Sequence, residues 1–278
     1  RLELLRAWLL RGHGISKGSD SNSVAATVAW HGGRRNSNPT LRDMAPDPRA
    51  LAAEHGDSLA VLVRHVHVVD AAAPGQHALA RAGRRSGSVT IVAVTKTVGV
   101  PEMEELRRLG VTHFGENRVH AVGPKKAALG SGVTWHMIGN IQRRKCKEVV
   151  RLFDCVDAVD RIELAEELGT RVGERPSPLP VLIEVNVARE ESKHGFTAET
   201  MPQALERLQS IDSIRVEGLM TMAPFFDNAE QTRPIFAELR ALADRFGLKR
   251  VSMGMSNDFE IAIEEGSTEV RIGTALFE

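Results

Sequence analysis

From residue 89 onward, short runs rich in β-branched residues alternate with amphipathic helical segments. This alternation is typical of parallel βα units, because a crossover helix must join each strand to the next parallel one. Eight strands are predicted, over residues 90–94, 112–115, 134–138, 155–159, 180–186, 215–220, 250–253 and 269–272. Eight strands with eight crossovers predict a single α/β domain, a closed (β/α)8 barrel of the TIM type. A doubly wound open sheet is the alternative, since the repeat is compact for a fold that typically takes about 250 residues.

The segments between the strands carry helical periodicity. One face of the segment before the seventh strand is apolar through Ile235, Leu239, Leu242 and Phe246. Gly247 follows, where a glycine commonly ends a helix. An earlier segment repeats the spacing with Met201, Leu205 and Leu208.

Composition restricts the function classes. The 36 basic and 36 acidic residues balance, so no overall field attracts nucleic acid or an anionic membrane. No apolar run approaches the roughly 18 residues that span a bilayer. Cys146 and Cys155 lack CxxC spacing and are expected to be free thiols in a reducing compartment. We expect a cytoplasmic monomer that binds neither nucleic acid nor membrane.

Residues 1–46 differ from the rest, being rich in Arg, Ser and Asn, with Glu3 and Asp20 as acidic residues before Asp43. A disordered, dispensable extension is the favoured interpretation, with Met44 as the natural start; an organellar transit peptide is the alternative. The barrel domain is expected over 47–278, opening with a helical pattern that Pro74 and Gly75 interrupt. His65 and His67 are two residues apart on that helix, which places them on different faces and argues against a metal site.

Phosphate usually binds a barrel at the loops after its last two strands. After the seventh strand, SMGMSND at 252–258 runs into a helix, and Gly254 lets the backbone turn or approach a ligand closely. Ser256 or Asn257 is predicted to cap that helix, Asn257 in a capping box with Glu260. The free N–H groups at the start of the helix would favour an anion.

After the eighth strand, alternation places Arg271 and Gly273 on one face, with Thr274 opening the next loop. Together the two turns form a candidate phosphate cup. Ordinary strand-to-helix turns, with Arg271 in a structural ion pair, explain the pattern equally well.

Lys96 follows the apolar first strand, and points either into the barrel mouth or into solvent. A lone lysine there is more often solvated. Inside the mouth, loss of solvation and nearby cations favour the neutral amine, which forms Schiff bases. A phosphate cup across the barrel favours this second interpretation, because the two sites together suit a phosphorylated aldehyde.

Seven motifs occur in order: VAVTKT around Lys96, HFGENRV (113–119), WHMIGNIQRRK (135–145), ESKHGF (191–196), GLMTM (218–222), SMGMSND (252–258) and GSTEVRIGTALF (266–277). From residue 89 onward the chain therefore resembles the pyridoxal phosphate homeostasis protein family, small barrels that bind pyridoxal 5′-phosphate (PLP) and are similar to the N-terminal domain of alanine racemase. The family more often has serine before the lysine, where this chain keeps a hydroxyl in Thr95.

The resemblance implies the roles of individual residues. Lys96 is the aldimine lysine, Asn117 lines the cofactor, and Arg271 faces the pyridine nitrogen. The phosphate loops supply Met255, Ser256, Gly273 and Thr274. His136, Gly139 and Gln142 match family positions without an assigned role. We favour a satisfied core histidine for His136 over a ligand-facing base.

Three more polar positions stay open. Glu184 and Asn186 alternate on the fifth strand and either point into the barrel or form a structural polar layer. Lys193 matches the family but can equally be a solvated loop lysine.

The resemblance implies a PLP carrier in vitamin B6 homeostasis, with PLP-requiring apoenzymes as recipients and no catalytic residues. Alanine racemase pairs its lysine with a tyrosine, and this chain contains no tyrosine. A cation facing the ring nitrogen also weakens PLP as an electron sink. A weak PLP-dependent amino-acid enzyme, similar to a racemase, remains the alternative.

Overall fold

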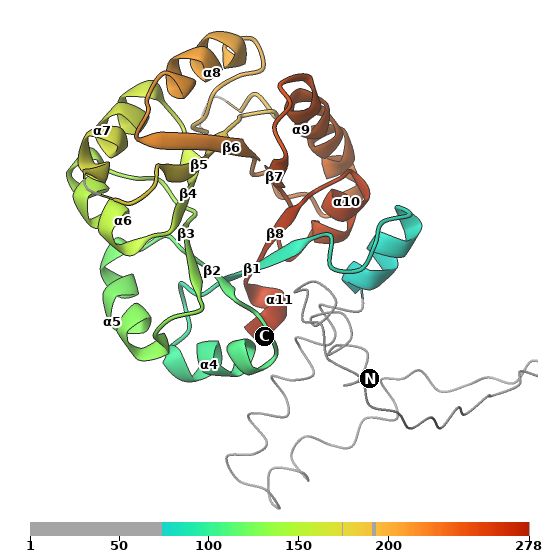
Figure 1. The fold of residues 1–278 in the computed structure, drawn as a ribbon. Coiled ribbons are helices and arrows are strands. Elements are labelled where there is room, and N and C mark those ends of the chain that lie inside the picture. Colours follow the sequence, from blue (N-terminus) through green and yellow to red (C-terminus); the bar gives the residue numbers. More distant parts are fainter. Residues whose placement is uncertain (1–73, 174, 191–192, 278) are drawn as a thin grey trace, which may run out of the picture.

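The computed structural model describes residues 74–173, 175–190 and 193–277. Their strands form one closed barrel in the order β1-β2-β3-β4-β5-β6-β7-β8, every neighbouring pair parallel. Viewed along the barrel, the helices form a ring outside the strands (Figure 1). The predicted (β/α)8 barrel is confirmed, and the open-sheet alternative is wrong because β8 pairs with β1.

All eight predicted strands are present, and their ends lie close to the predicted ones. The strands are β1 Thr90–Val94, β2 His113–Glu116, β3 Thr134–Met137, β4 Cys155–Val159, β5 Leu179–Glu184, β6 Ile214–Met220, β7 Arg250–Ser252 and β8 Glu269–Ile272. The largest difference is in β5, which ends at Glu184 rather than at Asn186. Asn186 leaves the sheet because its side chain binds both the N–H and the carbonyl of Glu190.

The described chain begins helical over residues 74–81, which include Pro74 and Gly75. The named helices are α4 Val100–Arg108, α5 Val119–Leu129, α6 Cys146–Leu152, α7 Ile162–Val172, α8 Met201–Gln209, α9 Arg233–Arg245, α10 Phe259–Glu264 and α11 Thr274–Phe277, with the 3-10 turns η1 Arg143–Lys145 and η2 Ala229–Thr232. Pro74 and Gly75 are thus helical residues, since proline is tolerated in the first turn of a helix. The pattern that they were predicted to interrupt lies before residue 74, outside the described residues. Gly75 faces Phe259 and Ile263 of α10.

The apolar core lies between the outer faces of the strands and the helix ring. The predicted α8 face is confirmed, because Met201, Leu205 and Leu208 are all buried. On α9, Leu239 and Leu242 are buried, while Ile235 and Phe246 pack partly buried against the same core. Gly247 ends α9 with φ +68°, as predicted.

The barrel interior, by contrast, carries charged side chains. Arg250 on β7 approaches Asp157 on β4, strands that are not neighbours, so the contact crosses the interior. Because side chains alternate along a strand, Arg271 lies on the same face of β8 as Glu269. The interior therefore carries charges that must be paired or bound to a ligand.

The predicted extension over 1–46, the domain boundary at 47 and the His65/His67 pair all lie outside the described residues. Among the described residues, no helix is both long and apolar enough to cross a membrane.

Candidate functional site

The predicted site residues follow four strands that are neighbours in the closed barrel, β7, β8, β1 and β2. Lys96 lies exposed in the turn after β1, and Asn117 lies exposed directly after β2. Ser256 follows β7, and Gly273 follows β8. The structure thus brings the sequence-predicted residues to one side of the barrel at the carboxyl ends of the strands, where barrel enzymes and binding proteins place their ligands.

The two phosphate-type loops contact each other through Ser256. Its Oγ accepts hydrogen bonds from the N–H groups of Gly273 and Ala275, both at 3.3 Å. Thr274 is exposed and begins α11, so it opens a helical turn and not the predicted loop. The Ser256 hydroxyl and two backbone N–H groups therefore converge at the start of α11, where they bond to one another.

Gly254 allows the β7 loop to fold down onto α10. Its φ is +94°, and a Cβ there would lie 2.5 Å from the Cβ of Ala262. Only glycine tolerates both the backbone conformation and this close approach. The predicted role of Gly254 in shaping the loop is confirmed.

The predicted helix caps are wrong. The N-cap of α10 is Asp258, which makes no side-chain capping bond; its Oδ1 accepts from the N–H of Met255 at 2.6 Å instead. The Asn257 amide donates to the carbonyl of Phe226, so it ties the loop to the segment after β6 and does not pair with Glu260. Burial raises the pKa of Asp258. The loop is held by this turn and not by a capping box.

Arg271 is 4% exposed, and its guanidinium donates to Ser252 Oγ at 2.7 Å and to the carbonyl of Thr221 at 2.8 Å. Within the described residues it forms no ion pair, which contradicts the structural-ion-pair alternative. Burial lowers its pKa, opposed chiefly by the carboxylate of Asp157. A guanidinium has five donors, so donors of Arg271 remain for a ligand above it.

Thr95 fixes the end of β1. It is fully buried, its N–H donates to the carbonyl of Gly115 at 3.0 Å, and its hydroxyl approaches the same carbonyl at 3.4 Å. The threonine hydroxyl thus joins β1 to β2 immediately before Lys96. A serine would offer the same group.

Sequence reasoning missed a buried ion pair beside this loop. Lys125 of α5 donates to Glu116 Oε1 at 2.6 Å and to the carbonyl of Thr95 at 2.7 Å. Glu116 belongs to the GEN motif that was singled out, but only Asn117 of that motif received a role. The signal was therefore present in Glu116, whereas nothing in the sequence pattern singled out Lys125.

His136 is a satisfied core histidine, as expected. Its Nδ1 lies 2.8 Å from Asp157 Oδ2, and its Nε2 lies 2.9 Å from His113 Nδ1. The Asp157 carboxylate raises the pKa of His136 against the opposing effect of burial. Sequence reasoning did not identify Asp157 or His113 as its partners, because they lie on the neighbouring strands β4 and β2.

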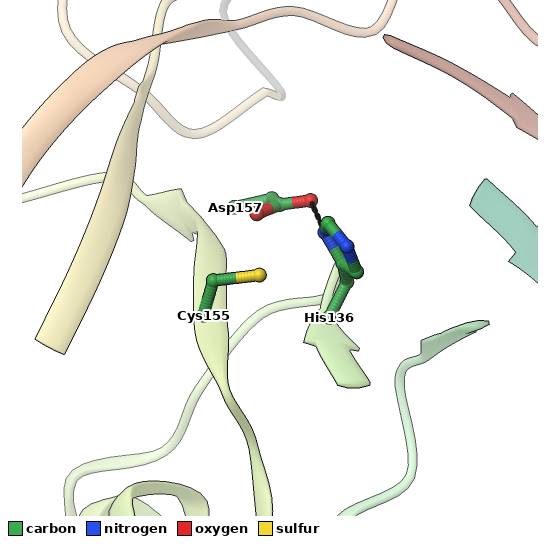
Figure 2. Close-up of side chains that lie close together, drawn as sticks. All are labelled: His136, Cys155 and Asp157. Carbon is green, nitrogen blue, oxygen red and sulfur yellow. Dashed lines mark hydrogen bonds and ion pairs between the residues drawn. The ribbon is translucent and has the colours of Figure 1, made fainter. Parts of the chain in front are cut away.

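Cys155 lies beside this pair, and Figure 2 shows its thiol beside the bonded Asp157 and His136. Burial raises the pKa of the Cys155 thiol well above its ordinary value, which disfavours the thiolate that binds metals. The guanidinium of Arg250, 4.0 Å from Asp157 Oδ1, already places a cation there. These side chains are therefore part of a hydrogen-bonded network inside the barrel.

Glu184 is buried at the carboxyl end of β5. Burial and the neighbouring Asp160 raise its pKa to about 7, although Arg271 favours its charged form. Asn186 instead organises the following loop, and Lys193 is exposed there, 4.0 Å from Glu190. Of the three open positions, only Glu184 faces the barrel interior.

The family model of the alanine racemase N-terminal domain matches residues 75–278. A pyridoxal phosphate homeostasis protein of Aquifex aeolicus is 39% identical over 209 residues, which cover 73% of this chain and 92% of the relative. A protein of the same name from Pseudomonas aeruginosa is 38% identical over 215 residues, covering 76% and 93%. The resemblance inferred from the seven motifs is confirmed.

Solved structures agree with the fold. PipY of Synechococcus elongatus PCC7942 with PLP bound superposes with a TM-score of 0.65 at 30% identity, covering 74% of this chain and all of that one (100%). An alanine racemase of Clostridium difficile 630 is 14% identical with a TM-score of 0.57, covering 73% of this chain and 55% of its own. At that identity the second likeness shows a shared fold alone.

Proposed function

Because the chain belongs to the pyridoxal phosphate homeostasis protein family, whose barrel is that of the alanine racemase N-terminal domain, we propose that it holds PLP on Lys96 and takes part in intracellular vitamin B6 homeostasis. The observation that carries the proposal is the convergence of Lys96, Arg271 and the Ser256–Gly273 contact on neighbouring strands. PLP is also the molecule bound in the PipY structure.

The residues fit the three chemical parts of PLP. The Ser256 hydroxyl and the N–H groups of Gly273 and Ala275, which bond to one another here, would turn to a phosphate. The buried Arg271 offers donors to a ring nitrogen, and the exposed Lys96 amine can reach an aldehyde. The absent Cβ of Gly254 lets the phosphate loop pack tightly enough to present these groups.

When bound, PLP supplies an aldehyde that forms a Schiff base with an amine. In this proposal Lys96 provides that amine, and the covalent link slows escape of the ligand. Ser256, Gly273 and Thr274 would hold the phosphate, Met255 and Asn117 would line the ring, and Arg271 would orient the ring nitrogen. The same guanidinium would keep that nitrogen unprotonated, which suits storage better than catalysis.

We infer a carrier role from the catalytic groups that racemisation requires. Racemisation needs one group to remove a proton and another to deliver it on the opposite face. The chain has no tyrosine, and His136 already bonds to Asp157 and His113. We therefore favour a non-catalytic carrier over a weak amino-acid enzyme. PLP-requiring apoenzymes as recipients, a monomeric state and a cytoplasmic location complete the proposal.

Borohydride reduction and peptide mapping test the attachment site. Purified protein loaded with PLP should carry the pyridoxyl label on Lys96, and Lys96→Ala should lose the label while retaining its melting temperature. Lys193→Ala is the matched control, since Lys193 is also an exposed loop lysine of a shared motif. A label that stays in Lys96→Ala would overturn the assignment.

Deuterium exchange at the α-carbon tests the absence of turnover. Alanine, serine and a wider amino-acid panel should exchange no faster with the PLP-loaded protein than with free PLP, and chiral analysis should find no racemisation. Exchange at ordinary enzymatic rates, about 1 per second or faster, would replace the carrier with the enzyme.

A further inference from the structure

Lys125 reaches from α5 to the backbone immediately before Lys96. Its Nζ donates to the carbonyl of Thr95 at 2.7 Å and to Glu116 Oε1 at 2.6 Å. The Lys125 side chain is 12% exposed and that of Glu116 is fully buried. Among the described residues, the Thr95 carbonyl has one other donor, the N–H of Val98 at 3.3 Å, which closes the turn that contains Lys96.

The other oxygen of Glu116 holds the next site loop. Oε2 accepts from the N–H groups of Asn117 at 3.2 Å and Arg118 at 3.3 Å. One carboxylate therefore binds the backbone of Asn117 with one oxygen and, through Lys125, the backbone of Thr95 with the other. A continuous chain of hydrogen bonds joins the Lys96 turn to the Asn117 turn.

Gly139 secures the far side of Asn117. A Cβ at Gly139 would lie 2.6 Å from the Cβ of Asn117, so only glycine lets the loop after β3 approach this closely. The N–H of Asn117 is thus held by Glu116, and the side chain of Asn117 packs closely against Gly139.

A neighbouring lysine shows what an ordinary lysine of α5 does. Lys126 Nζ donates to the carbonyl of Leu152 at 2.9 Å and lies 3.5 Å from Asp154, with side chains 35% and 42% exposed. Lys126 thus makes the same kind of contact as Lys125, but with a distant loop and with its side chain partly exposed to solvent. Burying an ion pair is costly and is poor evidence for added stability. The buried Lys125–Glu116 pair therefore needs another explanation.

We propose that Lys125 and Glu116 are positioning residues that hold the Lys96 and Asn117 turns in register for PLP. The inference rests on the proposed role of Lys96. The amine of Lys96 is effective as a trap only if its backbone stays in place, because a pre-positioned group reacts again before a released aldehyde diffuses away. Without Lys125 the Thr95 carbonyl keeps only its turn bond, and the Lys96 turn loosens.

The experiment measures release of PLP from the loaded full-length protein, captured by an excess of hydroxylamine. Losing one hydrogen bond to a charged group should accelerate release roughly tenfold to a hundredfold in Lys125→Met. Lys126→Met is the matched control and should release PLP at the parental rate. Lys125→Arg keeps a cation with several donors and should restore most of the retention.

A second measurement is independent of PLP. In the unloaded protein, amide hydrogen exchange of peptides covering residues 95–98 and 117–118 should become faster in Lys125→Met and stay parental in Lys126→Met. If Lys125→Met does not fold, Glu116→Gln replaces it, because the amide keeps the shape and removes the charge that holds Lys125.

The outcomes separate the two proposals. Parental release and parental exchange in Lys125→Met, or in Glu116→Gln where that variant is used, would overturn the positioning role. If the parent protein carries no borohydride-reducible label on Lys96, the proposed function fails, while the exchange measurement still decides whether the pair orders the two turns.

Discussion

The two ends of the barrel treat polar residues in opposite ways. At the end of the barrel where the strands begin, Arg250 binds Glu269 through two donors, at 2.5 and 3.1 Å, and Glu217 through a third at 2.6 Å. At the carboxyl end, Lys96 and Thr274 are exposed. One end carries a network of paired charges, and the other carries exposed side chains.

The difference shows how the barrel separates stability from function. Buried charges at the amino-terminal end must be paired, because nothing else there solvates them. Side chains after the strands can stay unpaired, since the loops carry them into contact with solvent or a ligand. Changes at the two ends should therefore have distinct phenotypes.

The largest effect is expected for Arg250→Met. Removing the guanidinium leaves Glu269 buried without its partner, and breaking a buried pair costs about 3–5 kcal/mol of unfolding free energy. Urea unfolding should show the loss, while the folded fraction still takes up PLP. Arg207→Met, which breaks an exposed pair with Glu166, should change stability by less than about 0.5 kcal/mol. Similar values for the two variants would mean that the interior network is not stabilising.

Glu184→Gln tests whether the buried carboxyl group at the end of β5 lowers the stability of the fold. The folded pKa of Glu184 is raised to about 7 from 4.5, so its cost to stability is absent below the unfolded pKa and grows as pH rises through both values. Removing this carboxyl should stabilise the unloaded protein at about pH 8 by up to about 3 kcal/mol and leave it unchanged at about pH 4. Urea unfolding at both pH values measures the difference. A variant destabilised at the higher pH would show that Arg271 depends on the charge of Glu184.

The smallest effects on stability are expected at the phosphate loops, where substitutions should change the affinity for PLP instead. Ser256→Ala and Thr274→Ala should each weaken PLP binding about tenfold to a hundredfold, since a hydrogen bond to a charged group contributes roughly 1.5–3 kcal/mol. Equilibrium titration of PLP measures the affinity, and thermal melting of the unloaded variants serves as the control. If both variants bind PLP like the parent, the phosphate lies elsewhere.

Local sequence patterns were sufficient where one element determines its own structure. The alternation of short runs with helical segments marked all eight strands, and the apolar spacing of Met201, Leu205 and Leu208 marked the buried face of α8. Gly247 and Gly254 were recognisable because positive φ favours one residue type. The predicted cap at Asn257 failed because the side chain found a partner, the carbonyl of Phe226, far away in the sequence.

By itself, then, the sequence determined the barrel, its family and the strand ends that carry Lys96, Arg271 and Ser256, because these follow from periodicity and from residues adjacent in the chain. Only the tertiary structure decided which polar groups pair: His136 with Asp157, Arg271 with Ser252, and Lys125 with both Glu116 and Thr95. These partners come from different strands and helices. Their pairing depends on barrel closure and strand register, which bring together residues that no local pattern relates.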